Sequence, residues 1–396
     1  MTSLTTHQPD KDACLNDWID WFWNLFLPAW VERTCDDNGP GFHDALDVSA
    51  KPINENRKTL LVQARLLFTF SHLAVISGDA TYRKAAQHAK DALSAFRKES
   101  GGYCKARTLT GEPTDIAEDE YASSYDQSFV ILSLCTWRQL VVDNQIDIEL
   151  EACWTVIENQ LTDSSTGLLL EHDNIDNPAA PTAPYRAQNP HMHMFEAALQ
   201  AYALTGDEIW ATRAALMRTK GLEYFFDQKS GTIREFRSAD LSPLNNKDGQ
   251  RREPGHQFEW AWLLYREAEL TGHTSTIAVA DRLLKFAEDH GTATSGAMAG
   301  AAFDAVSANL DWYENTFLLW PQTEAIKALA IRKDNTSSQR AQNLTLLMFQ
   351  AYFMERSAFI NQVDSLGNVI WPEALSRLLY HVVMALTEGA RARLWK

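Results

Sequence analysis

Two short stretches of the chain repeat one chemical pattern, a histidine followed three residues later by a glutamate. His193 precedes Glu196 and His256 precedes Glu259, with a proline a few residues upstream of each histidine. Residues three apart share one face of a helix, and proline suits the first helical turn because its missing N–H costs nothing there. A neutral imidazole whose second nitrogen meets a carboxylate is an effective general base near neutral pH. The spacing therefore predicts acid–base groups at the starts of two helices.

Simple packing and metal binding are the two other interpretations of these residues. His191 and His193 form a His-x-His pair, a spacing that also occurs in metal sites. On a helix, however, residues two apart point about 200° apart, so only one of the two can face inward. Di-iron bundles need Glu-x-x-His on two helices and further carboxylates, which this pattern does not supply. We therefore expect no metal and no cofactor.

Polar residues also interrupt two apolar segments, at Arg65 and at His381. A lone histidine such as His381 is more often a hydrogen-bonded core residue than a catalytic one. A buried Arg65 needs a partner, either a structural carboxylate such as Glu196 or Glu324, or a substrate oxygen. Glu324 lies in the first turn of a predicted helix, where favourable interaction with the helix dipole is a sufficient explanation for it. These alternatives stay open at the level of single residues.

The candidate residues belong to a repeat of about 64 residues. Turn signals, most of them glycine or asparagine beside aspartate, fall near positions 79, 143, 207, 273 and 334. Around each turn the chain has the same order: an apolar helix, the turn, an amphipathic helix and a long loop. One helix of each pair is too apolar for the surface, so it must lie inside the protein.

Six such units fit the 396 residues and predict an all-α (α/α)6 barrel of about twelve helices, six inner and six outer, in one domain over residues 1–396. An open solenoid is the alternative, but it should carry polar capping repeats at its ends. The aromatic-rich segment Asp17–Val31 and the apolar segment Ala374–Thr387 are predicted to be neighbouring helices that close the ring. The long loops should then lie together at one end of the barrel: residues 162–188, 231–253 and 291–316.

A barrel of this kind brings the starts of the inner helices to the end that carries the long loops. Polar or aromatic residues recur near these starts, at intervals of roughly 60 to 67 residues: Arg65, then Tyr125, Asp126 and Gln127, then His193, His256, Trp320 and His381. Polar groups at one depth of an otherwise apolar barrel predict a ligand pocket with a polar floor. Membership of this ring favours a functional role for His381 over the core alternative.

The composition limits the class of partner. The chain is 45% apolar and 11% aromatic and has a net charge of −16, so it can bury a large core and should expose an acidic surface. A nucleic-acid binder should be basic, and an anionic membrane would repel such a surface. Charges interrupt the apolar runs and the N-terminus lacks a signal-peptide pattern, so we expect no membrane partner. Five cysteines without a C-x-x-C pair are typical of a reduced cytoplasmic protein.

The motifs at these positions resemble those of the N-acylglucosamine 2-epimerase superfamily. The resemblance covers nearly the whole chain and rests on Gly41–Asp47, Val62–Arg65, Tyr125–Phe129, Gln188–Glu196, Pro254–Trp260, Trp320–Glu324 and Tyr380–His381. The Asn-Pro-His-Met-His and Tyr-Asp-Gln pieces are most similar to the D-mannose isomerase branch. The resemblance implies an (α/α)6 barrel that interconverts D-mannose and D-fructose without a metal.

The same resemblance implies roles for individual residues. The family's two acid–base histidines correspond to His256 and His381. Its sugar-contacting positions correspond to Arg65, Asn189, His193 and Glu259, to which we add three candidates from the predicted helix starts, Tyr125, Trp320 and Glu324. Relatives often carry an arginine just before the Trp-Pro motif, where this chain has Phe317–Leu319. A sugar with an anionic group at that place is therefore less expected.

Aldose–ketose isomerisation suits these residue types. The reaction removes a proton from C2 of the open sugar and returns one to C1 through a cis-enediol, while charge grows on O1 and O2. Arg65 or a second histidine can stabilise that charge. We assign His381 to the transfer between C2 and C1 and His256 to ring opening and the oxygen protons, and the reverse assignment stays open. A histidine base predicts that activity falls in acid with an apparent pKa of roughly 6 to 7.

Three rival functions stay open. A sugar 2-epimerase acting on mannose, glucose or an N-acylated hexosamine would use both histidines, on opposite faces of the sugar. A glycoside hydrolase or lyase on the same barrel would be expected to set two carboxylates across the pocket. A non-catalytic sugar-binding protein would show no turnover. The expected partner of the favoured enzyme is a monosaccharide, with the protein acting as a monomer or homodimer.

Overall fold

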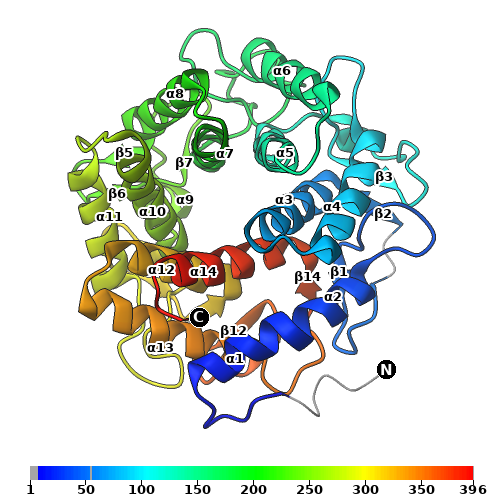
Figure 1. Ribbon diagram of the computed structural model, residues 1–396. Coiled ribbons are helices and arrows are strands. Elements are labelled where there is room, and N and C mark those ends of the chain that lie inside the picture. Colours follow the sequence, from blue (N-terminus) through cyan, green and yellow to red (C-terminus); the bar gives the residue numbers. More distant parts are fainter. Residues whose placement is uncertain (1–7, 54–55, 396) are drawn as a thin grey trace.

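Helices form two concentric rings in the computed structural model, which describes residues 8–53 and 56–395 (Figure 1). The inner ring consists of α3 (Leu60–Ser77), α5 (Ser124–Trp137), α7 (Asn189–Thr205), α10 (Pro254–Thr271), α12 (Leu319–Arg332) and α14 (Leu379–Arg391). The outer ring consists of α4 (Ala80–Leu93), α6 (Asn144–Asn159), α8 (Glu208–Phe225), α11 (Ile277–His290), α13 (Asn335–Tyr352) and the N-terminal helical segment formed by α1 (Leu15–Trp21), η2 (Phe22–Phe26) and α2 (Leu27–Thr34). The predicted (α/α)6 barrel is confirmed.

The inner ring closes through its last helix. α14 packs on both α12 and α3, and the rings of Phe68 and Tyr380 meet at 5.5 Å between centroids. This contact rules out the open solenoid. The N-terminal segment lies in the outer ring, and its residue Trp23 lines one pocket together with Thr387 and Arg391 of α14, in keeping with the predicted proximity of the first and last helices. It packs against α13, where Trp18 stacks on Phe349 at 5.6 Å.

The tight turns between inner and outer helices produce the repeat. Gly78, Gly206 and Gly272 each end an inner helix with φ of 72°, 68° and 75°, a region that a side chain disfavours. Asp79 and Asp207 follow two of these glycines, and each accepts a hydrogen bond from the backbone N–H two residues further on. A Gly-Asp pair therefore stops one helix and caps the next.

The inner helix α3 illustrates why these helices are so apolar. By length and hydropathy alone it is the one helix among the described residues that could cross a membrane. In the barrel, however, 72% of that stretch is buried among other helices. Burial on nearly all sides accounts for its composition, and its one charged residue, Arg65, is buried as well.

Local signals fix the starts of two outer helices. α6 begins at Asn144, where the side chain of Asp143 caps its first turn. α13 begins at Asn335, where the side chain of Asp334 accepts a hydrogen bond from the backbone N–H of Ser337.

Short antiparallel strands join the long loops at the end where the inner helices begin. They are β1 (Ala45–Leu46) with β14 (Ala374–Leu375), β2 (Arg57–Thr59) with β3 (Ala106–Thr108), β4 (Arg186–Ala187) with β7 (Phe236–Arg237), β5 (Phe226–Asp227) with β6 (Thr232–Ile233), β8 (Arg251–Arg252) with β9 (Ala305–Ser307) and β10 (Tyr313–Glu314), and β11 (Thr316–Leu318) with β12 (Gln362–Asp364) and β13 (Val369–Trp371). The remaining short helices are η3 (Ser94–Phe96), η4 (Ala117–Glu120), α9 (Lys247–Gln250) and η5 (Ser376–Leu378). Because β4 pairs with β7 and β8 with β9, the three long loops lie side by side, as predicted. The last helix begins at Leu379 rather than Ala374, since Ala374 belongs to β14.

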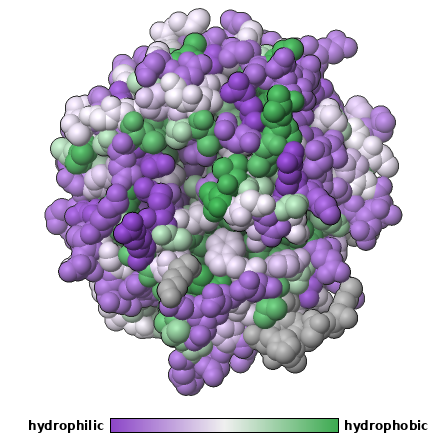
Figure 2. All heavy atoms as spheres, viewed as in Figure 1, coloured by the Kyte–Doolittle hydropathy of each residue, from purple (hydrophilic) through white to green (hydrophobic). Residues whose placement is uncertain are grey.

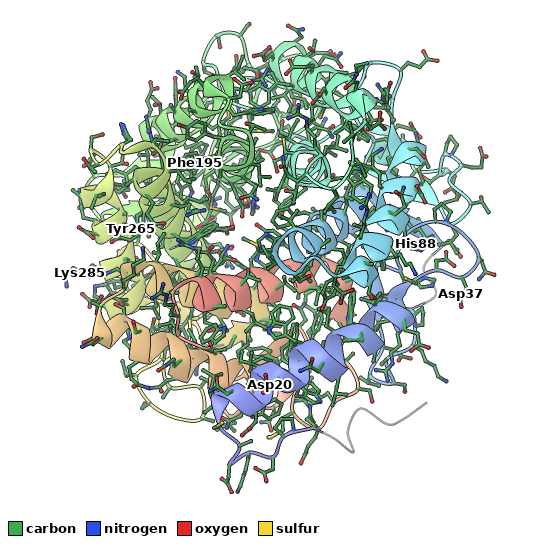
Figure 3. All side chains as sticks on the ribbon, viewed as in Figure 1. Asp20, Asp37, His88, Phe195, Tyr265 and Lys285 are labelled. Atoms are coloured by element: carbon green, nitrogen blue, oxygen red, sulfur yellow. The ribbon has the colours of Figure 1, made fainter. Side chains whose placement is uncertain are left out.

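The outside of the barrel is largely polar. Figure 2 shows hydrophilic residues over most of the face in view, and Figure 3 shows Asp20 on α1 and Lys285 on α11 near its perimeter. Cys135 and Cys153 are buried, and the five cysteines are free.

Candidate active site

Each of four inner helices carries a buried glutamine that holds the preceding loop. The glutamine accepts a hydrogen bond from one backbone N–H and donates one to the C=O of the same loop residue, at 2.7–3.1 Å. The pairs are Gln63 with Phe42, Gln127 with Tyr103, Gln257 with Ile233 and Gln322 with Ala302. We call these glutamines the clamp residues. Their positions in the sequence show the same repeat of about 64 residues.

His191 occupies the clamp position of α7. Its Nε2 accepts from the backbone N–H of Leu169 at 2.9 Å, and its Nδ1 donates to the C=O of Ala187 at 3.2 Å. Both ring nitrogens are therefore used by the backbone, and His191 does not face the axis. Gln127 was predicted to line the pocket, which is wrong because it is a clamp residue. Its neighbour Asp126, predicted at the same place, does not line the pocket either.

Replacing His191 with glutamine should leave activity and thermal stability close to those of the unmodified protein. In four other repeats a glutamine at this position likewise accepts from a loop N–H and donates to a backbone C=O. His191→Ala should instead destabilise the protein by about 1–3 kcal/mol, since it leaves buried backbone groups unpaired. Thermal unfolding and sugar turnover measured on both variants test this. A His191→Gln protein that folds normally but is inactive would contradict the structural role.

Two residues after each of the four clamp residues, and two after His191, a side chain points at the barrel axis. These five side chains are Arg65, Phe129, His193, Glu259 and Glu324, and His381 of α14 completes the set. Contacts run from one to the next around much of the ring. The Arg65 guanidinium lies 4.2 Å from the Phe129 ring centroid, and the Phe129 ring 4.8 Å from that of His193. Nδ1 of His193 lies 3.7 Å from Oε1 of Glu259.

The ring closes through His381. Its Nδ1 donates to Oε1 of Glu324 at 2.8 Å, and its Nε2 accepts from Nη1 of Arg65 at 3.1 Å. The sequence placed Tyr125, His256 and Trp320 at this depth, but each lies about one helical turn nearer the helix start. There, Tyr125 accepts a hydrogen bond from Nη2 of Arg65 at 2.7 Å.

A pocket of about 250 Å³ opens above this ring. The predicted site residues that line it are Arg65, Tyr125, Asn189, His193, His256, Glu259, Trp320 and His381. Glu324 is the predicted residue that does not: its side chain is fully buried and reaches the pocket only through His381. Leu318, just before the Trp-Pro motif, also lines the pocket and adds no charge to it.

His381 is held in the neutral form. Burial, Arg65 and Lys327 together hold the pKa of this imidazole well below 6.5, against the opposing effect of Glu196. Because Nδ1 carries the proton shared with Glu324, the unprotonated Nε2 is the nitrogen that accepts from Arg65. A neutral imidazole with an unprotonated nitrogen in a sugar-sized pocket is suited to act as a base.

His256 is held in the opposite charge state. Its Nδ1 lies 2.7 Å from Oε2 of Glu235 and 3.3 Å from Oε2 of Glu253. Burial disfavours the charged imidazole, but the two carboxylates outweigh it and raise the pKa of His256 to about 9. The ring of Trp320 covers His256 at 4.8 Å between centroids. At neutral pH His256 is therefore an acid.

Sequence reasoning missed Glu235 because it lies in a loop, outside the helical repeat. Its carboxylate also accepts from the backbone N–H of Glu253 at 2.9 Å and from Nε2 of Gln188 at 3.2 Å. These bonds fix the carboxylate against His256. The pairing of β4 with β7 beside it was not visible in the sequence, so no sequence signal identified this partner.

Asn189 and Glu259 both line the pocket, and their side-chain oxygen atoms have no hydrogen-bond partner in the described part of the chain. These atoms are buried, and buried polar atoms in proteins are nearly always paired. Burial, followed by the nearby Glu324, raises the pKa of Glu259 well above its ordinary value. A sugar rich in hydroxyl groups would satisfy both residues.

Two groups of side chains have the spacing of metal ligands: His193 with Glu196 and Glu259, and His256 with Glu235 and Glu253. In both groups the imidazole already donates to a carboxylate, at 3.1 Å from His193 to Glu196 and at 2.7 Å from His256 to Glu235. Hydrogen bonding therefore accounts for both arrangements, and metal independence stays a prediction.

Comparisons with known proteins agree with this geometry. The family model described as N-acylglucosamine 2-epimerase (GlcNAc 2-epimerase) matches residues 41–385. Mannose-6-phosphate isomerase of Rhizobium meliloti (strain 1021) is 31% identical over 79% of this chain and 78% of its own. D-mannose isomerase of Marinomonas mediterranea is 26% identical over 82% of this chain and 84% of its own.

Among solved structures, cellobiose 2-epimerase from Bacillus thermoamylovorans B4167 has the same fold. It superposes with a TM-score of 0.82 over 95% of this chain and 98% of its own, at 17% identity. At that identity the similarity concerns the barrel rather than the substrate.

Proposed function

The chain belongs to the N-acylglucosamine 2-epimerase family, and from that premise we propose that this sugar isomerase interconverts D-mannose and D-fructose without a metal ion. The observation that carries the proposal is one pocket with two histidines in opposite charge states. Pairs of titratable groups whose pKa values are pushed apart are typical of acid–base catalysis. The likeness to a D-mannose isomerase supports the choice of sugar.

In this mechanism Nε2 of His381 removes the proton from C2 of open-chain mannose. His256 donates a proton to O1, which gives a neutral cis-enediol. His256, now neutral, then accepts the hydroxyl proton of O2 while His381 returns a proton to C1, and fructose results with all protons balanced. Arg65, beside Nε2 of His381, stabilises negative charge as it grows on the oxygens. The opposite charge states support this assignment over its reverse.

The alternative is a sugar 2-epimerase. Epimerisation removes the C2 proton on one face and returns a proton on the other, so neutral His381 together with protonated His256 could serve this reaction too. The likeness to a D-mannose isomerase favours the isomerase, and the sugar products distinguish the two reactions. A glycoside hydrolase is disfavoured, because the pocket carboxylates Glu253 and Glu259 both come from one side, at and near the start of α10.

Product analysis tests the proposal. The purified protein is incubated with EDTA and, in separate samples, mannose, fructose, glucose, N-acetylglucosamine or mannose 6-phosphate, the last because of the name of the Rhizobium relative. Mannose should give fructose at a rate that exhaustive chelation leaves unchanged. Loss of activity with EDTA and rescue by a divalent ion would overturn metal independence. Turnover of mannose 6-phosphate alone would show that an anionic sugar is preferred.

The pH dependence of kcat/KM should be bell-shaped. Activity requires neutral His381 and protonated His256, so it should rise as pH increases through the pKa of His381 and fall as pH passes about 9. The acid limb should lie below the range of 6 to 7 that the sequence predicts, because burial and two cations oppose the imidazolium. Rates measured from pH 4 to 10 check both limbs. Activity that keeps rising to pH 10 would contradict His256 as the acid.

Free thiols and an acidic composition support a cytoplasmic setting as a further part of the proposal. The site is complete within one chain, which is compatible with either a monomer or a homodimer.

A further inference from the structure

A buried lysine lies beneath the pocket, and the mechanism above gives it no task. Lys327 follows Glu324 by one turn of α12, and its side chain has no exposed surface. Its Nζ lies 2.6 Å from Oε2 of Glu324 and 4.1 Å from the ring centroid of Trp262. Lys327 does not line the pocket, so any effect on the sugar must pass through another residue.

Lys327, Glu324 and His381 form a continuous chain that leads into the pocket. Glu324 faces Lys327 with Oε2 and accepts from Nδ1 of His381 with Oε1 at 2.8 Å. The other nitrogen of the same imidazole, Nε2, meets Arg65 at 3.1 Å. An ionised Glu324 can only accept a hydrogen bond, so it keeps the proton of His381 on Nδ1.

We propose that Lys327 is a positioning residue for proton transfer: it keeps Glu324 ionised and in place, so that His381 presents an unprotonated Nε2 to C2 of the sugar. The inference rests on the proposed role of His381 as the base. Burial raises the pKa of Glu324, and Lys327 is the largest influence that opposes this rise. Without Lys327, Glu324 would be a buried carboxylate close to Glu196 and Glu259 and would tend to take up a proton. A protonated Glu324 could donate to His381 and would no longer determine its tautomer.

The effect of Lys327 has to be weighed against every charge near His381. The titratable and charged groups around the imidazole come from the six inner helices and the segments at their starts. They are Arg65, Tyr125, His193, Glu196, Glu253, His256, Glu259, Glu324, Lys327, Arg377 and Tyr380. After burial, Arg65 and Lys327 contribute most to the low pKa of His381. Lys327 itself stays charged, because its carboxylate neighbours outweigh its burial and raise its pKa.

The test compares pH profiles of variants. Lys327→Met removes the charge at similar volume, and the acid limb of kcat/KM should be displaced by about one pH unit, the scale expected when a neighbouring charge is lost. The limb moves to higher pH while Glu324 stays ionised, because the imidazolium loses a repelling neighbour. It moves to lower pH once Glu324 takes up a proton, because the imidazolium then loses an attracting neighbour as well. Lys327→Arg keeps the charge, and its acid limb should stay where it is in the unmodified protein.

A matched control removes a buried cation elsewhere in the barrel. Arg218 of α8 pairs with Glu267 of α10, outside the pocket, and both are largely buried. Arg218→Met should lower thermal stability without moving the acid limb. If Lys327→Met lowers the rate equally at every pH, as a purely structural defect would, the proposal is wrong.

A measurement on the unmodified protein avoids any dependence on variant folding. Nitrogen-15 NMR of histidine-labelled protein should show His381 as the Nδ1–H tautomer between pH 6 and 8, with its signals identified by their loss in His381→Asn. A proton on Nε2 would overturn the proposal. This readout needs no turnover, so a protein that fails to convert mannose would refute the proposed function and leave the tautomer result to judge Lys327 separately.

Discussion

Replacing His381 with alanine should lower the turnover of mannose by about a hundredfold or more, which is the usual contribution of a general base. The imidazole lines the pocket, is neutral and presents Nε2 toward the substrate side. Its removal enlarges the pocket and leaves no new cavity in the packed core, so the barrel should still fold. Rates measured together with thermal unfolding separate the chemical effect from a loss of structure.

The isotope result for His381 is more specific than the rate. In D2O, mannose should give fructose that carries deuterium at C1, because the base exchanges its proton with solvent between the two transfers. Incorporation should be partial where the shielded base returns the same proton. His381→Ala should stop exchange of the proton at C2, and glucose should form late or not at all, since it requires protonation from the other face.

His191→Gln is the matched control for this experiment. It replaces a histidine on another inner helix, α7, that faces the backbone of a loop rather than the axis. It should therefore leave both the rate and the exchange unchanged. If His381→Ala keeps most of its exchange rate, His381 is a core residue, and if glucose appears as fast as fructose, the enzyme is a two-base epimerase.

His256→Ala should also cost on the order of a hundredfold on mannose, because the protonated imidazole opens the sugar ring and supplies the oxygen protons. The loss should be smaller on a short aldose that cannot form a six-membered ring, since that substrate needs no ring opening. Initial rates on mannose and on such an aldose give the comparison. An equal loss on both substrates would exclude a role in ring opening.

Glu235→Gln tests how the charge of His256 arises. Glu235 raises the pKa of His256, so removal of its charge should lower that pKa and move the alkaline limb of activity downward by about one pH unit or more. Asp163→Asn is the control, because Asp163 is a buried acid paired with Arg186 at 3.0 Å outside the pocket. An alkaline limb that stays near pH 9 in Glu235→Gln would contradict the assignment.

Much of the barrel was predictable because its signals are local. The Gly-Asp turn that stops one helix and caps the next lies within two residues, and the excess of apolar residues in inner helices such as α3 is visible in composition. Since a closed barrel brings equivalent helix positions together, the spacing of His193, His256 and His381 was sufficient to place them in one pocket.

The directions in which individual side chains of the inner helices point were less predictable. Gln127 and Phe129 are two residues apart on α5, and this separation turns Gln127 to the loop and Phe129 to the axis. The repeat of the clamp residues could have revealed this, because Gln63, Gln257 and Gln322 recur at the same interval as Gln127.

The sequence by itself determined that two histidines would share a polar pocket in a helical barrel, whereas only the tertiary structure decided which is the acid and which the base. Both histidines lie in apolar helices, so their own segments do not distinguish them. Their charge states come from neighbours across space: Arg65 at 3.1 Å from His381, and Glu235 at 2.7 Å from His256. A pKa depends on distances between charges and on burial, and the chain brings these particular groups together only when the barrel has closed.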